Sequence, residues 1–419
     1  MDELMLAGIP VEFVLFALTL LGVAVLHHHT FAVSVSGLAA ITAYKLVFAG
    51  FKTGPGLPGL AAHMSHEWVV LANLFLLLMG FALLARHFEK SGIPDIMPTL
   101  LPHDWKGAFL LLVIVFVLSS FLDNIAAALI GGTMAMKLFG GRVHIGYVAG
   151  IVAASNAGGS FSVVGDTTTT MMWIDGVSPL KVADAIVAAS VALVVCGIPA
   201  ALQQQRFSPI VKDLVPGAHI DWHRAGIVLL ILVSAISANV CANLAMPDLL
   251  DRVPVIGLAV WAAMLATHSI RAPDWGLLRD NLKGTLFLLA LVTCASMMPV
   301  EHLPAASWPA TLGLGFLSAV FDNIPLTALA LRQGGYDWGF LAYAVGFGGS
   351  MLWFGSSAGV AICNLFPESR DVFGWLRGGW HVALAYVVGF AVMLAALGWH
   401  PDAPHRKRVE APGWRQASV

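Results

Sequence analysis

SNAGGSFSVVGDTTTTMMW, residues 155–173, is the stretch from which the fold can be worked out. It lies within hydrophobic sequence, yet it contains three glycines, an aspartate and four consecutive threonines. A glycine costs about 1 kcal/mol relative to alanine inside a helix, and an ionisable side chain at membrane depth is costly unless it faces protein or water. Irregular backbone is tolerated there only where it is buried or lines a cavity. The stretch therefore predicts a broken membrane helix with a binding site at the break.

The composition of the whole chain indicates a polytopic membrane protein. Of its 419 residues, 58% are hydrophobic and 11% are charged, with a formal net charge of −2, whereas soluble domains carry about 25% charged residues. We therefore expect the lipid bilayer to be the partner, and no nucleic acid. The four cysteines are scattered singly through apolar segments without the spacing of a metal site, which is typical of small buried hydrophobic residues.

Apolar runs of spanning length, roughly 17 to 25 residues, flank two interrupted regions. We predict spans at 9–26, 30–50, 68–86, 180–202, 225–245, 254–271, 284–300 and 376–399. The interrupted regions are 107–175 and 309–366. Each contains an Asp-Asn pair followed by a glycine-rich stretch, so the two regions form an internal repeat.

Each Asp-Asn pair is predicted to be the tip of a re-entrant hairpin, because its apolar arms, 107–122 and 125–138 in the first repeat, are too short to span comfortably. The glycine-rich stretches then interrupt true crossings. An odd number of predicted crossings separates the two hairpins, so they enter the membrane from opposite faces, as in the inverted repeats of secondary transporters. The alternative is that each Asp-Asn pair interrupts one long tilted helix.

The predicted fold is therefore an all-α polytopic membrane protein with two inverted repeats, each built from a re-entrant hairpin and a broken transmembrane helix. The domains are scaffold helices at 1–106, a first repeat core at 107–202 (hairpin 107–139, broken helix 143–175), scaffold helices at 203–300, a second repeat core with the last helix at 301–399 (hairpin 309–335, broken helix 338–366), and a polar tail at 400–419.

Three carboxylates lie at the predicted membrane depth, those of Asp123, Asp166 and Asp322. A carboxylate in a low-dielectric environment can exchange a proton for Na+ near neutral pH, so we predict that the three bind Na+ as metal ligands or carry protons. They could instead cap half-helices, and Asp166, followed by four threonines, has the pattern of a cap. The two roles are compatible, because a capping carboxylate keeps spare lone pairs.

Neutral oxygens accompany these acids. We predict that the ion and proton site is completed by Asn124, Asn156, Asn323, Thr167 and Thr168. We predict that the substrate path is lined by Ser155, Gly158, Gly159, Ser160, Gly348, Gly349, Ser350, Ser356 and Ser357. Single Ser and Thr side chains in membrane helices often bond to their own backbone instead. No Lys or Arg falls within 143–175 or 345–366, which favours cation and proton exchange over organic-anion uptake.

The motifs resemble those of the ion transporter superfamily, and within it those of the NhaD-type sodium/proton antiporters. That family carries an Asn-Ala-Gly-Gly stretch leading to Gly-Asp and a run of threonines, as in NAGGSFSVVGDTTTTMMW at 156–173. Its Asp-Asn tips resemble 123–124 and 322–325, and its second glycine break resembles GGSMLWFGSSAGVA at 348–361. The similarity extends over most of the chain.

The resemblance implies Na+(Li+)/H+ antiport by alternating access, in a homodimer of the bacterial inner membrane. It implies an ion and proton site formed by Asp123, Asn124, Asp166, Thr167, Asp322 and Asn323. We expect no enzyme, since no catalytic constellation is present, and no cofactor apart from Na+ and H+ as transported or coupling ions.

Other branches of the superfamily leave an alternative, an Na+-coupled carrier of an anion such as citrate, a dicarboxylate, arsenite or another oxyanion. In the dicarboxylate branch the tips resemble Ser-Asn-Thr, so the aspartates at 123 and 322 favour the antiporter branch. The first tip continues with three alanines, 126–128, where the antiporters tend to carry threonines.

Overall fold

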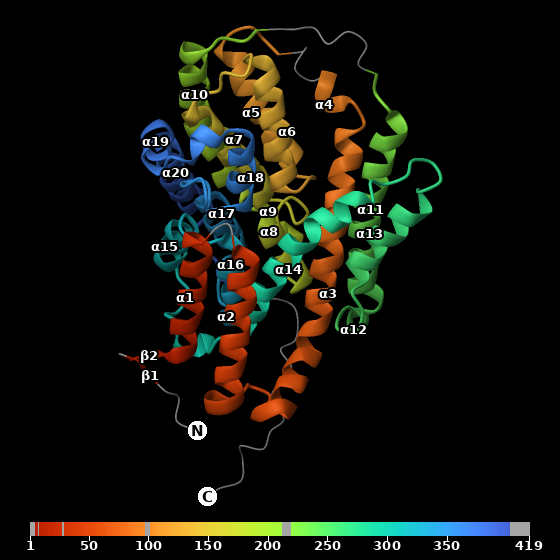
Figure 1. Ribbon diagram of the computed structural model, residues 1–419, viewed down its shortest axis with the longest axis vertical. Coiled ribbons are helices and arrows are strands. Elements are labelled where there is room, and N and C mark those ends of the chain that lie inside the picture. The colour runs from red at the N-terminus through yellow and green to blue at the C-terminus, as the bar shows by residue number, and fades with distance from the viewer. Residues whose placement is uncertain (1–4, 7, 27–28, 97–100, 212–218, 403–419) are drawn as a thin grey trace, which may run out of the picture.

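The computed structural model describes residues 5–6, 8–26, 29–96, 101–211 and 219–402, and this part of the chain is almost entirely helical (Figure 1). Two short strands, β1 (Met5–Leu6) and β2 (Ile9–Pro10), pair antiparallel near the start. Five helical segments within the described residues are long and apolar enough to cross a membrane: Thr30–Ala49, Gly56–Glu89, Pro179–Phe207, Trp222–Ala242 and Trp380–Leu397. The protein is therefore an all-α, multi-pass membrane protein, as its composition predicts.

The N-terminal helices are α1 (Val11–Val25), α2 (Thr30–Tyr44) with its π-helical extension η1 (Lys45–Ala49), α3 (Gly56–Glu89) and the short α4 (Ile93–Ile96). Helix α3 runs along most of the length of the molecule (Figure 1). It begins twelve residues before the predicted span at 68–86. The extra turns contain His63 and Glu67, whose polar side chains lower the local hydropathy, so the hydropathy pattern did not predict this part of the helix. Both side chains are buried, His63 in contact with Ser296 of α14 and Glu67 in contact with Arg332 of α16.

The first interrupted region folds as α5 (Trp105–Ser119), α6 (Asn124–Leu138), α7 (Ile145–Ser160) and α8 (Thr167–Ile174), and α9 (Pro179–Ala183) and α10 (Ile186–Phe207) follow. Helices α5 and α6 pack against each other and against α7. The first Asp-Asn pair thus lies at a turn between two packed helices and does not interrupt one long helix. The glycine-rich stretch forms the break between α7 and α8.

The middle of the chain forms α11 (Trp222–Ala245), α12 (Pro247–Leu250), α13 (Val255–Ala266) and α14 (Gly276–Ser296). After η3 (Val300–His302), the second interrupted region folds as α15 (Trp308–Ser318), α16 (Asn323–Gln333), α17 (Trp338–Gly348) and α18 (Ser357–Leu365). The chain then forms η4 (Pro367–Arg370), α19 (Val372–Gly378) and α20 (Trp380–Leu397).

The two interrupted regions repeat the same close helix approach. A Cβ atom added to Gly158 would lie 2.0 Å from the carbonyl oxygen of Phe116, and one added to Gly348 would lie 2.3 Å from that of Gly315. Beside these glycines, Ser119 Oγ donates to the Ser155 carbonyl at 2.6 Å, as Ser318 Oγ does to Val345 at 2.6 Å. Glycine is therefore required where α5 meets α7 and where α15 meets α17, because any side chain would push the backbones apart.

Helices from the two halves of the chain pack between one another. Helix α10 packs on α20, α7 on α17, α6 on α18 and α8 on α16. The largest apolar cluster spans both halves and includes the fully buried Tyr147, Trp338 and Phe347. This packing brings the two breaks, which lie almost 200 residues apart in the sequence, into direct contact.

Candidate functional site

Three helices begin at the site, and an aspartate caps each of them. Asp123 Oδ2 accepts from Ile125 N at 3.1 Å at the start of α6, and Asp322 Oδ1 accepts from Ile324 N at 3.0 Å at the start of α16. Asp166 Oδ1 accepts from Thr168 N at 3.0 Å at the start of α8. The predicted caps are therefore present in the structure. Each cap uses one carboxylate oxygen, which leaves the other available for a further contact.

The second oxygen of Asp166 is where the two Asp-Asn turns meet. Asp166 Oδ2 accepts from Asn124 Nδ2 at 3.0 Å and from Asn323 Nδ2 at 3.5 Å. Asp166 is 2% exposed, and both asparagines are buried. One carboxylate oxygen therefore contacts the first residue of both α6 and α16.

Asn156 connects the first break to the second. Its Oδ1 accepts from Asn124 Nδ2 at 3.0 Å, while its Nδ2 donates to Ser350 Oγ at 2.9 Å and to Ser356 Oγ at 3.1 Å. Ser356 also caps α18 by accepting from Gly359 N at 3.3 Å. All of these groups are buried. The network fixes the α7–α8 break against the α17–α18 break.

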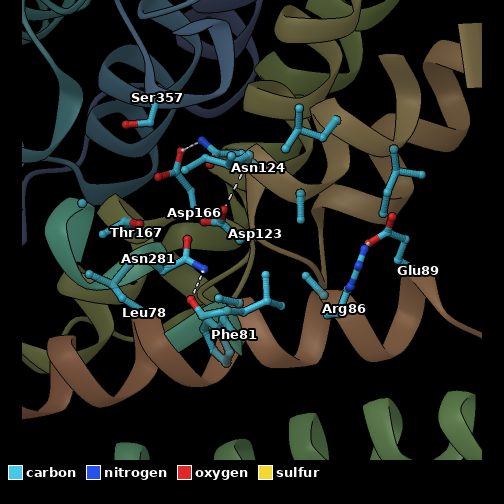
Figure 2. Close-up of a pocket in the computed structure, with 18 of the residues that line it drawn as sticks. Leu78, Phe81, Arg86, Glu89, Asp123, Asn124, Asp166, Thr167, Asn281 and Ser357 are labelled. Carbon is cyan, nitrogen blue, oxygen red and sulfur yellow. Dashed lines mark hydrogen bonds and ion pairs between the residues drawn. The ribbon is translucent and has the colours of Figure 1, made fainter. Parts of the chain in front are cut away.

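A cavity of about 840 Å³ reaches this network. At its inner end it is lined by Asp123, Asn124, Asp166, Thr167, Asn323 and Ser357, and its walls are formed largely by α3, α6 and α14. Its other end is lined by Arg86, Glu89, Lys90, Asp95 and Lys137. Figure 2 shows Arg86 and Glu89 of this end on the other side of the pocket from Asp166 and Thr167. Glu89 and Lys90 are exposed, so the cavity opens to solvent at that end. The inner carboxylates can therefore be reached from one side of the molecule.

The charges of the cavity favour a cation. At the open end the basic side chains are paired with acids, Lys137 with Asp95 and Lys90 with Asp274, both at 2.8 Å. At the inner end, no basic residue in the described part of the chain forms an ion pair with Asp123 or Asp166. Two unpaired carboxylates in an environment of low dielectric give the inner end a negative potential.

The three predicted carboxylates do not form one cluster. Among the described residues, no group of three or more His, Cys, Asp or Glu side chains is arranged to hold a metal ion. Asp123 and Asp166 line the cavity, whereas Asp322 is not among the lining residues and accepts from Ser357 Oγ at 3.3 Å. An ion at the inner end would therefore meet one or two carboxylates together with amide and hydroxyl oxygens.

The remaining predicted residues separate into two groups. Thr167 and Ser357 line the cavity, while Thr168 is buried at the Asp166 cap. The other predicted path residues are buried behind the lining: Ser155, Gly158, Gly159, Ser160, Gly348, Gly349, Ser350 and Ser356. Of these, Ser155 Oγ donates to the Val152 carbonyl at 2.9 Å and Ser160 Oγ to the Ala157 carbonyl at 2.8 Å, the backbone bonding expected of helical serines.

Sequence reasoning did not single out the polar wall of the cavity. Thr170 on α8 and both Asn281 and Thr285 on α14 line it. Asn281 lies just before the span predicted at 284–300, whereas Thr285 lies inside that span and Thr170 inside the stretch 155–173.

Comparison with known proteins relates the chain to sodium/proton antiporters. No family model matches it. "Sodium/proton antiporter 1" of Arabidopsis thaliana is 25% identical in an alignment that covers 91% of this chain and 71% of the relative. "Na(+)/H(+) antiporter NhaD" of Vibrio parahaemolyticus is 26% identical over 67% of this chain and 78% of the relative, and the protein of the same name from Alkalimonas amylolytica is 27% identical over 67% of each.

These relatives are named as transporters and not as enzymes, in agreement with the prediction from the sequence. Their alignments extend over two thirds or more of the chain. The resemblance indicated by the motifs is therefore confirmed, and the chain is similar to the NhaD-type sodium/proton antiporters over most of its length.

Proposed function

We propose that this protein is a secondary transporter that exchanges Na+ or Li+ for H+ by alternating access. The observation that carries the proposal is the position of Asp166. It is buried, lies at the inner end of a cavity that opens on one side, has no basic partner in the described chain and accepts hydrogen bonds from both Asp-Asn turns. The names of the relatives support the same exchange.

The mechanism rests on competition for one carboxylate. A proton on Asp166 neutralises the buried charge, and so does a cation held by Asp166 with the Thr167 hydroxyl oxygen, while Asn124 and Asn323 donate hydrogen bonds to the carboxylate. Hard cations prefer such oxygen ligands. Because one positive charge neutralises the Asp166 carboxylate, entry of the cation there displaces the proton, and the carrier changes orientation with either one bound.

The proposed architecture has two inverted repeats, each with a re-entrant hairpin (α5–α6, α15–α16) and a broken helix (α7–α8, α17–α18). The matching glycine contacts and caps of the two regions support it. The N-termini of the helices at the site carry the positive ends of the helix dipoles, which orient the carboxylates and stabilise their negative charge. We further propose a homodimer in the bacterial inner membrane, as in the implied family.

The open end of the cavity faces the cytoplasm in this proposal. Arg86, Lys90 and Lys137 lie at that end, and an excess of Lys and Arg marks the cytoplasmic side of membrane proteins. The conformation described is then the inward-open state of the cycle.

A transport assay tests the proposal. Purified protein in liposomes with an acidic interior and an internal pH dye would receive Na+, Li+, K+, citrate and arsenite in turn. We expect Na+ and Li+ to raise the internal pH and the other solutes to have no effect. No response to any cation, together with Na+-dependent uptake of labelled citrate or arsenite, would instead establish the alternative anion carrier.

A further inference from the structure

The cavity is closed at its inner end by an apolar seal. Leu74, Leu78, Phe81 and Ala85 of α3 line the cavity at the spacing of one helix face. Beyond Leu74 the space is filled by a cluster of buried side chains that includes Leu74, Met171, Leu291, Ile324 and Ala328. The cluster contains side chains of α8 and α16, the helices that Asp166 and Asp322 cap, so it lies against the inner end of the cavity.

Glu67 lies on the same face of α3, seven residues before Leu74 and thus about 10 Å further along the helix axis. Its carboxylate pairs with the guanidinium of Arg332. The Glu67 side chain is 8% exposed and that of Arg332 is 38% exposed. The pair therefore bridges two helices just beyond the seal, with its acidic member buried and its basic member reaching solvent.

Helix α16 connects this ion pair to the ion site. It begins at Asn323, which contacts Asp166, and Arg332 lies in its last turn, within a helix of 11 residues. Helix α3 belongs to the scaffold, whereas α16 is the second arm of a proposed hairpin. A movement of α16 that followed a change at Asp166 would therefore act directly on the Glu67–Arg332 contact.

The first hairpin carries an equivalent ion pair at the open end. Lys137 lies in the last turn of α6, as Arg332 does in α16, and it pairs with Asp95 at 2.8 Å. That pair is much more exposed, with side chains 50% and 46% accessible. The two hairpin ends thus differ: the pair at the open end is solvated, and the pair at the closed end holds a buried carboxylate.

We propose that the Glu67–Arg332 ion pair is the gate on the closed side of the carrier. This inference rests on the proposed alternating access. The pair forms when the cavity is open at the Lys137 end, and it breaks when the carrier opens at the Arg332 end. Other charged or polar contacts lie nearby, namely Lys45–Glu12 at 3.8 Å, His63–Ser296 at 3.0 Å and Lys52–Glu301 at 3.1 Å, but among these described contacts none joins α3 to α16.

Reversible cross-linking tests whether the pair must separate. In a variant with the four cysteines replaced by serine, Glu67→Cys and Arg332→Cys would be joined by a bis-methanethiosulfonate long enough to span the two original side chains. We expect cross-linked protein in liposomes to lose Na+/H+ exchange and a reductant to restore it, while each single-cysteine variant stays active after the same treatment. Exchange at the same rate before and after reduction would overturn the gate.

A second measurement does not depend on transport. Cys294 is fully buried in the apolar seal and can report its opening. With Cys196, Cys241 and Cys363 replaced by serine, we expect Glu67→Gln and Arg332→Gln each to speed N-ethylmaleimide labelling of Cys294 by on the order of tenfold, because loss of a partly buried pair favours the open state. The matched Lys137→Gln variant, which removes an exposed pair, should not speed it.

The two measurements separate failure of the gate from failure of the proposed function. If the parent protein exchanges no ion, the proposed antiport is wrong, while Cys294 labelling still reports the gate. Unchanged labelling in both Glu67→Gln and Arg332→Gln, with both variants as thermally stable as the parent protein, would overturn the gate even if antiport is observed.

Discussion

Asn323 Nδ2 lies 3.5 Å from Asp166 Oδ2, although the two residues are 157 positions apart in the sequence. Asn124 Nδ2 contacts the same oxygen at 3.0 Å from the opposite half of the site. A change in the charge of this carboxylate therefore alters contacts to α6 and α16 together. This arrangement can couple occupancy of the site to movement of both hairpins.

The asparagine amides should determine cation affinity more than folding. We expect Asn124→Ala and Asn323→Ala each to raise the apparent KM for Na+ about tenfold, because a hydrogen bond to a charged group is worth roughly 1.5–3 kcal/mol. Initial rates of exchange at varied Na+ concentration measure this. Asn281→Ala is the control, since Asn281 also lines the cavity but donates to the Leu277 carbonyl. An equal rise in KM for the control would contradict the assignment.

The close helix contacts at Gly158 and Gly348 should be essential for stability. Added Cβ atoms would lie 2.0 Å and 2.3 Å from backbone oxygens, so we expect Gly158→Ala and Gly348→Ala to destabilise the protein by roughly 1–3 kcal/mol or more. Thermal unfolding in detergent measures the loss. Gly226→Ala on α11, where an added Cβ meets nothing within 4 Å, should leave the Tm unchanged or raise it.

The loop before α11 should give the protein an acid-sensitive contact. Arg271 Nε donates to Asp221 Oδ2 at 2.7 Å, and this hydrogen bond lowers the pKa of Asp221 below its ordinary value of 3.8. A lowered pKa in the folded state stabilises the fold above pH 3.8, and that stabilisation is lost as the pH falls through the lower folded value.

Asp221→Asn isolates this ion pair, because asparagine still caps a helix. We expect the variant to have a lower Tm than the parent at pH 7, and the difference to shrink as the pH falls below 3.8. Arg271→Gln should behave in the same way. A Tm difference that persists unchanged at acid pH would show that the contact stabilises through packing and not through charge.

Asp322 should matter less to exchange than Asp166. Asparagine can keep the cap that Asp322 provides to α16, and Asp322 is not among the residues that line the cavity. We expect Asp322→Asn to retain measurable exchange in liposomes. Complete loss of exchange in a correctly folded Asp322→Asn protein would show that this carboxylate also carries the ion or the proton.

The sequence was most informative where local chemistry was unusual. The break between α7 and α8 and the Asp166 cap could be predicted because Gly, Asp and Thr are unfavourable in a lipid-facing helix. The start of α3 could not, because His63 and Glu67 are acceptable there only through partners on distant helices. Helix α14 likewise starts at Gly276, eight residues before its predicted span, and Arg279, Asp280 and Lys283 in its first turns are exposed.

Within the site, residue types could be predicted but their grouping could not. The three aspartates were predicted to share one role, because each lies at the predicted membrane depth. The packing of α8 on α16 and of α6 on α18 decides that Asp166, and not Asp322, lies in the cavity and receives both asparagines. Such packing depends on long-range contacts that local sequence patterns do not record.

The most direct test of the central claim is proton release on cation binding. Purified protein in weakly buffered detergent solution would be titrated with Na+ and Li+ while the pH is recorded. We expect the parent protein to release protons on addition of either cation, and monodisperse Asp166→Asn protein of similar Tm to release none. Undiminished proton release from Asp166→Asn would contradict the claim that cation and proton compete for this carboxylate.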